Sequence, residues 1–196
     1  MVAERVFIQG AVTHPQGPKY GVVRYGNVIG SRGSVINKFL DLCRQQKPLP
    51  ITSPDMVRFW LTMEQGARFA LSSMMGMDSG QIFVPKLPKM KITQVADAVT
   101  EVVTGQYTGN RYASNAGIRT GEKLSEELIS NEEARWTFDL GDRYVISQTV
   151  PSHKFVDGKD ASRMGTEWAG YSCDSSWWWL DYRDMVRIIH ALEKSK

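Results

Sequence analysis

Residues 20–34 read Tyr20-Gly-Val-Val-Arg-Tyr-Gly-Asn-Val-Ile-Gly-Ser-Arg-Gly-Ser34, and they indicate the fold class of the chain. The apolar run over 20–25 is typical of a buried strand. The glycine-rich segment 26–34 predicts a loop, and Ser34 is typical of a helix N-cap. The residues that follow place apolar side chains on one side of a helix: Val35, Ile36, Phe39, Leu40 and Cys43. A strand, a glycine-rich loop and a helix in this order favour an α/β protein.

The rest of the chain also alternates between strand-like and helix-like segments, which supports the α/β class. Helices are expected over 2–9, over 63–74 after a Thr62 cap, from a Thr93 cap to Val103, over 121–129 and over 182–194. Further strands are expected over 81–85, 116–119, 135–140 and 143–148, followed by a polar loop over 151–170.

Composition excludes several classes of protein. The 196 residues are 42% hydrophobic and 23% charged, which is ordinary for a globular chain and too apolar for general disorder. The net charge of +3 is too small to imply a nucleic-acid or membrane partner. No run approaches the roughly 18 apolar residues of a membrane helix, and the N-terminus lacks the pattern of a signal peptide. The two cysteines have no zinc-ligand spacing, so no metal is expected and the chain is expected to be cytoplasmic.

The glycines of the 26–34 loop allow three interpretations. Gly26-x-x-x-Gly30-x-x-Gly33 follows a strand and precedes a helix, as a dinucleotide-binding turn does. The spacing departs from G-x-G-x-x-G, and no acidic residue ends a second strand about 20 positions later. A tight strand-to-helix turn is the simplest alternative. The third is a polar nest for an anionic or hydroxylated ligand, formed by backbone donors with Asn27, Ser31, Arg32 and Ser34.

A second polar concentration, Arg119-Thr-Gly-Glu122-Lys123, follows an expected strand. Arginine can hold a phosphate with two parallel hydrogen bonds, and a nearby glutamate can accept hydrogen bonds from ribose hydroxyls. An Arg119–Glu122 ion pair at the start of a helix explains the same spacing. The sequence offers binding groups of this kind but no recognisable general base.

Five segments in order resemble one known family. They are Val22-Val-Arg-Tyr-Gly-Asn-Val-Ile-Gly-Ser-Arg-Gly-Ser34, Pro50-Ile-Thr-Ser-Pro-Asp-Met-Val-Arg-Phe-Trp60, Ile82-Phe-Val-Pro-Lys-Leu-Pro-Lys-Met-Lys-Ile92, Gly117-Ile-Arg-Thr-Gly-Glu-Lys123 and Tyr171-Ser-Cys-Asp174. Together they resemble the soluble UDP-N-acetylglucosamine 4,6-dehydratases, which are extended short-chain dehydrogenase/reductases of polysaccharide and flagellin-sugar pathways. The likeness extends from residue 1 to about residue 190. The chain departs from the family at Asn37 and Thr120, where proline is usual, and at Ser125, where histidine is usual.

The resemblance implies an α/β fold that is the C-terminal part of an extended short-chain dehydrogenase/reductase, or Rossmann-like, fold. The segment Ala3-Glu-Arg-Val-Phe7 resembles the end of the helix that carries the catalytic Tyr-x-x-x-Lys, so the N-terminal dinucleotide-binding half is expected to be missing. Residues 1–50 would then be the remnant of the NAD(P)-binding domain. Residues 51–196 would be mainly the substrate-binding lobe with returning sheet elements. A separate chain could supply the missing half, and the family favours homo-oligomers.

The resemblance also implies site residues, by position. The cofactor NADP would be lined by Val28, Ile29, Gly30, Ser31 and Arg32. The sugar nucleotide would be contacted by Asn27, Val35, Thr52, Arg119 and Glu122. The same comparison assigns the 26–34 loop to a later strand end that touches both ligands, in place of the first Rossmann turn. No catalytic residue is expected within the chain, because the Tyr-x-x-x-Lys pair is absent.

The implied activity is a sugar-nucleotide 4,6-dehydratase, a lyase that converts UDP-N-acetylglucosamine to a UDP 4-keto-6-deoxy sugar for surface polysaccharide or glycan biosynthesis. This chain alone would be inactive, as a truncated or split enzyme. Two alternatives remain open from the sequence. One is a non-catalytic module that binds sugar nucleotides, and the other is a different NAD(P)-dependent nucleotide-sugar epimerase.

Overall fold

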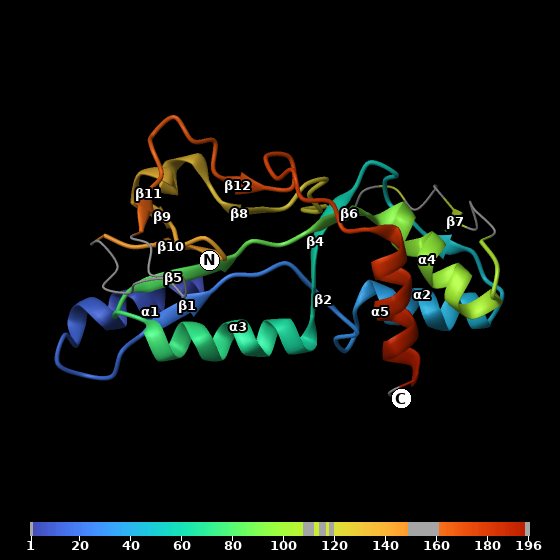
Figure 1. The fold of residues 1–196 in the computed structure, drawn as a ribbon, viewed down its shortest axis with the longest axis horizontal. Helices are drawn as coiled ribbons and strands as arrows, with labels where there is room; N and C mark the ends of the chain where they lie inside the picture. Colours follow the sequence, from blue (N-terminus) through green and yellow to red (C-terminus); the bar gives the residue numbers. More distant parts are fainter. Residues whose placement is uncertain (1, 108–111, 114–116, 118–119, 149–160, 195–196) are drawn as a thin grey trace. The chain divides into compact units, whose positions relative to one another are not determined.

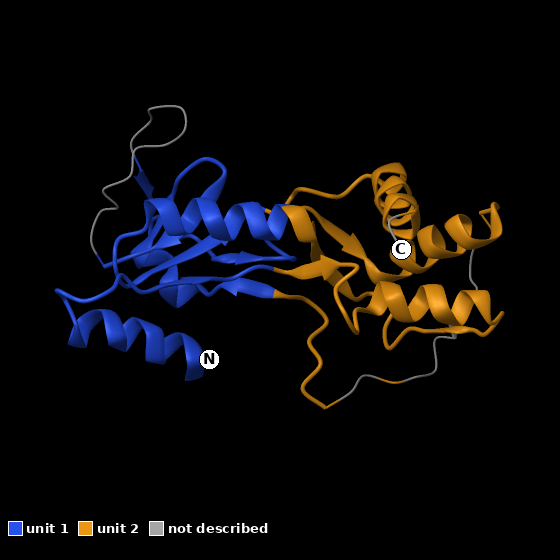
Figure 2. Ribbon diagram, turned by 90° about the horizontal axis from the view of Figure 1, so that it is seen from below, with its two compact units in different colours: residues 1–25, 65–86, 127–175 blue, residues 26–64, 87–126, 176–196 orange. Residues whose placement is uncertain are grey.

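A computed structural model describes residues 2–107, 112–113, 117, 120–148 and 161–194. The described chain forms two compact units, each assembled from three segments of the sequence (Figure 2). Unit 1 comprises residues 1–25, 65–86 and 127–175, and unit 2 comprises residues 26–64, 87–126 and 176–196. The expected division at residue 50 falls within a segment of unit 2, and its assignment to cofactor and substrate parts stays a prediction.

Unit 1 is built on a five-stranded mixed sheet in the order β1-β5-β10-β9-β11 (Figure 1). The strands are β1 (Gly21–Val23), β5 (Gln81–Pro85), β9 (Thr137–Asp139), β10 (Arg143–Ile146) and β11 (Ser162–Arg163). β1 and β5 are parallel, and every residue of β5 is buried, which accounts for its continuous apolar run Ile-Phe-Val. The other elements are α1 (Val2–Thr13), α3 (Met63–Gly76) from Gln65 onward, β8 (Glu127–Ile129), the 3₁₀ helix η1 (Asn131–Trp136) and β12 (Tyr171–Ser172).

A cluster of three charged side chains joins the elements of unit 1. The Arg24 guanidinium binds Glu4 of α1 at 2.5 Å and Glu133 of η1 at 2.7 Å, and it donates to the Leu128 carbonyl at 2.8 Å. The hydrogen bond from Arg24 lowers the pKa of the Glu4 carboxyl below its ordinary value. Burial raises the pKa of the Glu133 carboxyl, but hydrogen bonds from Arg24 and Ser130 outweigh it, so the net direction is also down.

Unit 2 is an α/β unit with three helices around a short sheet. The sheet has the order β2-β4-β6, from β2 (Asn27–Ile29), β4 (Val57–Thr62) and β6 (Lys89–Lys91), and β2 and β4 are parallel. The helices are α2 (Val35–Arg44), α4 (Ile92–Thr104) and α5 (Tyr182–Lys194), and a small pair joins β3 (Leu49–Pro50) to β7 (Tyr112–Ala113). None of the described helices is both long enough and apolar enough to cross a bilayer.

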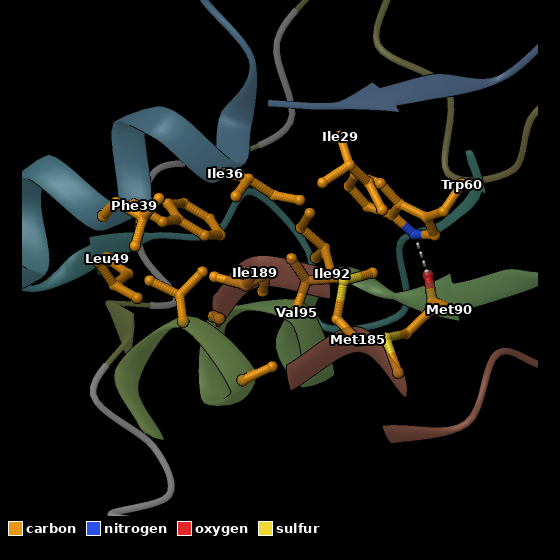
Figure 3. Packing of buried hydrophobic residues seen from close by; sticks show 14 of the residues in the cluster. Ile29, Ile36, Phe39, Leu49, Trp60, Met90, Ile92, Val95, Met185 and Ile189 are labelled. Carbon is orange, nitrogen blue, oxygen red and sulfur yellow. Dashed lines mark hydrogen bonds between the residues drawn. The ribbon is translucent and has the colours of Figure 1, made fainter. Parts of the chain in front are cut away.

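The core of unit 2 lies between the three helices and the sheet (Figure 3). Ile36 and Phe39 of α2 pack with Val95 of α4 and with Met185 and Ile189 of α5. The same cluster includes Ile29 and Trp60 from the sheet, and the Trp60 indole N–H donates to the Met90 carbonyl at 3.4 Å. This core fixes the ends of β2 and β4, and therefore the backbone from which the candidate site is built.

Several sequence predictions are confirmed. The strand expected over 81–85 is β5, and the helix expected over 182–194 is α5. Ser34 caps α2, because its hydroxyl accepts the backbone N–H of Asn37. The strands near 135–140 and 143–148 are β9 and β10. The first helix is longer than expected and extends to Thr13.

Three predictions are wrong. The segment 26–34 is not all loop, because Asn27–Ile29 pairs with Trp60–Thr62 as β2. Thr93 does not cap α4, which begins at Ile92 after Lys91 and has no side-chain cap. Residues 121–129 are not a helix, because the Leu124 carbonyl accepts the Val57 N–H and the segment ends in β8. The strand expected over 116–119 falls almost wholly outside the described residues, as does much of the loop expected over 151–170.

Candidate functional site

A cavity of about 260 Å³ lies within unit 2. Its walls come from β2, the start of α2, the segment after β3, β4 and the segment that contains Glu122. The polar and charged side chains at the cavity are Asn27, Lys38, Thr52, Arg58 and Glu122. The remaining walls are mostly apolar and include Val35, Phe39, Ile51, Met56, Trp60 and Ile92. A cavity that combines apolar walls with convergent polar groups can bind a small molecule.

Asn27 is held at the cavity by the pairing of β2 with β4, which places it opposite Trp60. Its side-chain Nδ2 donates to the Phe59 carbonyl at 3.3 Å and to Glu126 Oε1 at 2.8 Å. The Glu126 carboxylate also accepts the backbone N–H of Phe59 at 3.1 Å, through Oε2. These bonds join β2, β4 and the segment before β8 into one network.

Arg58 also belongs to this network, and its guanidinium contacts other groups of the protein. Its guanidinium donates to the carbonyl oxygens of Leu124 at 2.9 Å and Lys123 at 2.5 Å. Its Nε lies 3.7 Å from Glu126 Oε1, and only 12% of its side chain is exposed. Arg58 therefore fixes the backbone directly after Glu122, and its contribution to the site is to position that segment.

The surroundings of Glu126 shift the pKa of its carboxyl. Burial raises the pKa of its carboxyl above the ordinary value, against the hydrogen bonds from Phe59 and Asn27 and the charge of Arg58. Those contacts favour the ionised form but do not reverse the effect of burial. Burial and hydrogen bonding therefore act in opposite directions on the pKa of this half-buried carboxyl. The carboxyl is bonded to Asn27, which lines the cavity.

The start of α2 supplies the positive end of the cavity. Gly33, Val35 and Lys38 line it, and Lys38 is exposed. The partial positive charge of a helix N-terminus adds to the ammonium charge in attracting an anionic group. The Thr52 hydroxyl, on the segment after β3, donates to the Met56 sulfur at 3.8 Å, which is a weak acceptor, so its oxygen lone pairs can accept from a ligand.

Four of the five expected substrate contacts lie together in the structure. Asn27, Val35, Thr52 and Glu122 line the same cavity, although they are spread over almost a hundred positions in the sequence. Arg119, the fifth, lies outside the described residues. Whether these residues bind a sugar nucleotide stays a prediction.

The expected cofactor residues occupy β2 and the turn after it. Ile29 is buried in the core of unit 2, so it could touch a cofactor only through its backbone. The Ser31 hydroxyl donates to the Val28 carbonyl at 3.0 Å, and the Asn37 side chain donates to the Gly30 and Ser31 carbonyls at 3.1 and 2.9 Å. These bonds close the turn internally and leave the exposed Arg32 as its outward-facing polar side chain.

Three of the four side chains of the polar nest that the sequence suggested make bonds within the protein, and ligand binding by this loop stays a prediction. Ser34 caps α2 and Ser31 bonds within its own turn, while Asn27 points its N–H groups into the network with Glu126. Sequence reasoning also missed Lys38, Arg58 and Glu126. Arg58 precedes Phe59 and Trp60, and both aromatic side chains are buried in the core.

Comparison with known proteins identifies the family. The model of the family described as "Polysaccharide biosynthesis protein" matches residues 1–148. The inverting UDP-N-acetylglucosamine 4,6-dehydratase of Campylobacter jejuni is 38% identical over 186 residues, which cover 89% of this chain and 52% of that protein. A UDP-glucose 4-epimerase of Rickettsia canadensis is 37% identical over 139 residues, covering 71% of this chain and 37% of that protein.

The fold has a solved counterpart. The X-ray structure of Pen from Bacillus thuringiensis superimposes with a TM-score of 0.80 and 26% identity, over 98% of this chain and 56% of that one. The chain spans about half the length of the curated dehydratases it matches. The α/β class and the resemblance to the UDP-N-acetylglucosamine 4,6-dehydratases are both confirmed. From the match over residues 1–148 and these relatives, the chain belongs to the polysaccharide biosynthesis protein family.

Proposed function

We propose that the cavity of unit 2 binds a UDP-sugar, UDP-N-acetylglucosamine, and that the chain is the substrate-binding part of a UDP-N-acetylglucosamine 4,6-dehydratase. The observation that carries this proposal is the convergence of Asn27, Val35, Thr52 and Glu122 on one cavity. The identity to the Campylobacter jejuni dehydratase supports the choice of substrate.

The volume and the charged residues of the cavity suggest which part of the ligand each residue contacts. A volume of about 260 Å³ is slightly below the range of ligand pockets, about 300–1,000 Å³, so we infer that the described walls enclose only part of a sugar nucleotide. Lys38 and the N-terminus of α2 suit the diphosphate. Glu122 and Thr52 can accept hydrogen bonds from ribose or sugar hydroxyls.

The proposed reaction is redox-neutral. A hydride leaves C4 of the sugar and a proton leaves O4, which forms the C4 ketone. The C5 proton and the C6 hydroxyl then leave together as water, which forms a C5–C6 double bond. The hydride returns to C6 and a proton adds to C5. NADP, when bound, supplies the hydride carrier. Of the residues expected to line it, Arg32 fits a contact with an anionic cofactor, since it is exposed beside the closed turn. The residues of this chain bind and orient the sugar; they supply no proton-transfer group in this proposal.

We propose that the catalytic tyrosine and lysine come from residues outside these 196. No tyrosine in the sequence is followed by lysine four positions later. The companion part would pair with β1, which lies at the end of its sheet and has β5 as its only neighbour among the described strands. It would also cover the exposed apolar side chains of α1 and α3, which include Val6, Phe7, Leu71 and Met74.

Calorimetric titration of the chain with UDP-N-acetylglucosamine tests the proposal. We expect binding that Arg119→Ala and Glu122→Gln each weaken about tenfold or more, as expected for loss of a hydrogen bond to a charged group. Lys47→Met is the matched control, because Lys47 is exposed and does not line the cavity. A folded chain that gives no binding heat, or variants that bind as tightly as the wild type, would contradict the proposal.

A second candidate function is a nucleotide-sugar 4-epimerase, favoured by the 37% identity to the Rickettsia canadensis epimerase. The products separate the two activities. If the chain is part of a dehydratase, then together with the companion part that supplies the catalytic tyrosine and lysine it would convert UDP-N-acetylglucosamine to a 4-keto-6-deoxy sugar. An epimerase would yield the C4 epimer, with the C6 hydroxyl retained.

A further inference from the structure

We propose that Glu126 is a positioning residue that orients the Asn27 side chain so that it offers the ligand a hydrogen-bond acceptor. This inference rests on the proposed function, because it concerns the same cavity. It deepens that function by naming the kind of ligand group that Asn27 recognises. It also assigns a role to a carboxylate that the sequence did not bring forward.

The orientation of the Asn27 amide follows from its neighbours. A carboxamide has two N–H donors on nitrogen and two lone pairs on oxygen. The two partners of Nδ2 are the Phe59 carbonyl at 3.3 Å and the Glu126 carboxylate at 2.8 Å. The carbonyl and the ionised carboxylate can only accept, so a flipped amide would place Oδ1 against two acceptors and lose both bonds. The network therefore fixes which atom is nitrogen.

Glu126 is itself held in place by β4. Its Oε2 accepts the backbone N–H of Phe59 at 3.1 Å, while Oε1 receives the Asn27 bond and lies 3.7 Å from the Arg58 Nε. The backbone of Phe59 thus contributes twice, through its N–H to Glu126 and its carbonyl to Asn27. The carboxylate cannot move without breaking a contact to the strand that also supports Asn27.

The consequence for the ligand is directional. Asn27 lines the cavity and both its N–H groups are bound to protein, so Oδ1 is the polar atom that remains for a ligand. An amide oxygen pairs with a hydroxyl or an N–H group. In a UDP-sugar such donors are the sugar and ribose hydroxyls, the acetamido N–H and the uracil N–H. Phosphate oxygens only accept hydrogen bonds at neutral pH, so they do not pair with the Asn27 oxygen. In the proposed function they contact Lys38 and the N-terminus of α2.

Glu126→Gln is the informative variant. Asn27 and Phe59 donate to different oxygens of the carboxylate, and the introduced amide has an N–H₂ group in place of one of them, so that group faces one of the two donors. We expect the Asn27 amide to turn and the affinity for UDP-N-acetylglucosamine to fall about tenfold or more. Glu127→Gln is the matched control, because it removes the same charge one position away at an exposed residue that does not line the cavity.

A double-mutant cycle distinguishes positioning from general destabilisation. If Glu126 acts through Asn27, then Glu126→Gln weakens binding in the wild-type background and weakens it no further in the Asn27→Ala background. Equal losses in both backgrounds would overturn the inference, as would unchanged affinity in the single variant. Circular dichroism melting of each variant confirms that the folded state is retained.

Side-chain NMR of the ligand-free chain tests the network without any ligand. We expect slow hydrogen exchange for the Asn27 amide protons, compared with those of the exposed Asn131, and little change in their signals on saturation with UDP-N-acetylglucosamine. Exchange as fast as that of Asn131 would overturn the inference. If the wild type shows slow exchange but binds no UDP-sugar, the positioning by Glu126 stands and the proposed function fails.

Discussion

Gly26→Ala tests how closely β2 approaches β4 beside the cavity. A Cβ at position 26 would lie 2.5 Å from the Phe59 Cβ and 2.7 Å from the Phe59 carbonyl oxygen, where ordinary contacts begin near 3.4 Å. Because the obstacle includes the strand backbone, a change of side-chain rotamer cannot relieve it. The strands must separate by several tenths of an ångström. The displaced carbonyl is the one that accepts from Asn27.

The magnitude follows from two opposing effects. Overpacking costs about 1–3 kcal/mol, and losing the Asn27–Phe59 hydrogen bond costs about 1 kcal/mol. Alanine reduces the freedom of the unfolded chain, which returns about 0.4–1 kcal/mol. We therefore expect the free energy of unfolding to fall by about 2 kcal/mol, and the melting temperature by about 4–8 °C. Affinity for UDP-N-acetylglucosamine should fall as well.

Gly10→Ala is the matched control for this experiment. It lies within α1 of unit 1, where a new Cβ would make ordinary contacts of 3.6 Å with the Tyr20 ring. Alanine in a helix interior is favoured over glycine by about 0.5–1 kcal/mol, so this variant should be slightly stabilised. Urea unfolding followed by circular dichroism compares the two. A Gly26→Ala chain as stable as the wild type, with unchanged affinity, would refute the described strand packing.

Two further predictions concern charge. Lys38→Met should weaken UDP-N-acetylglucosamine binding and reduce its dependence on salt, because an ion contact to phosphate is screened; titrations at low and high salt check this, with Lys47→Met unchanged. In unit 1, Arg24 lowers the pKa of Glu4 and Glu133 below the ordinary 4.5, so their contribution to stability is present above pH 4.5 and is lost as the pH falls through the lowered values. Urea unfolding between about pH 5 and 3 should therefore show a shallower loss of stability for Glu133→Gln than for the wild type, and parallel curves would contradict this.

The parts of the fold that the sequence predicted are those set by local patterns. Ser34 followed by apolar residues at helical spacing predicted α2 and its cap, and the amphipathic pattern over 182–194 predicted α5. The strand β2 was missed because Asn27–Ile29 is short and becomes a strand only by pairing with Trp60–Thr62. Such pairing depends on tertiary contacts that local periodicity does not contain.

The helix expected over 121–129 does not form, and the reason is related. Glutamate, lysine and leucine there are good helix formers, yet their backbone and side chains bond to β4, as in the bonds from Val57 and Arg58 to the Leu124 carbonyl. Tertiary hydrogen bonds therefore override helix propensity, which is worth less than about 1 kcal/mol per residue.

The candidate site was predictable to the extent that a family resemblance supplied positions. Asn27, Val35, Thr52 and Glu122 came from that resemblance, and the structure brings them to one cavity. Glu126 and Arg58 act through contacts with residues more than sixty positions away, so no local pattern marks them. Lys38 could be predicted as a cavity residue only if the side of α2 that faces the cavity were known.

NMR can locate the sugar-nucleotide binding site directly. Titration of isotope-labelled chain with UDP-N-acetylglucosamine should shift the backbone signals of Asn27, Val35, Thr52 and Glu122, all within unit 2. Signals of α1 and β5 in unit 1 should stay in place. Absence of shifts at the cavity, or shifts centred in unit 1, would contradict binding of the sugar nucleotide in the cavity of unit 2.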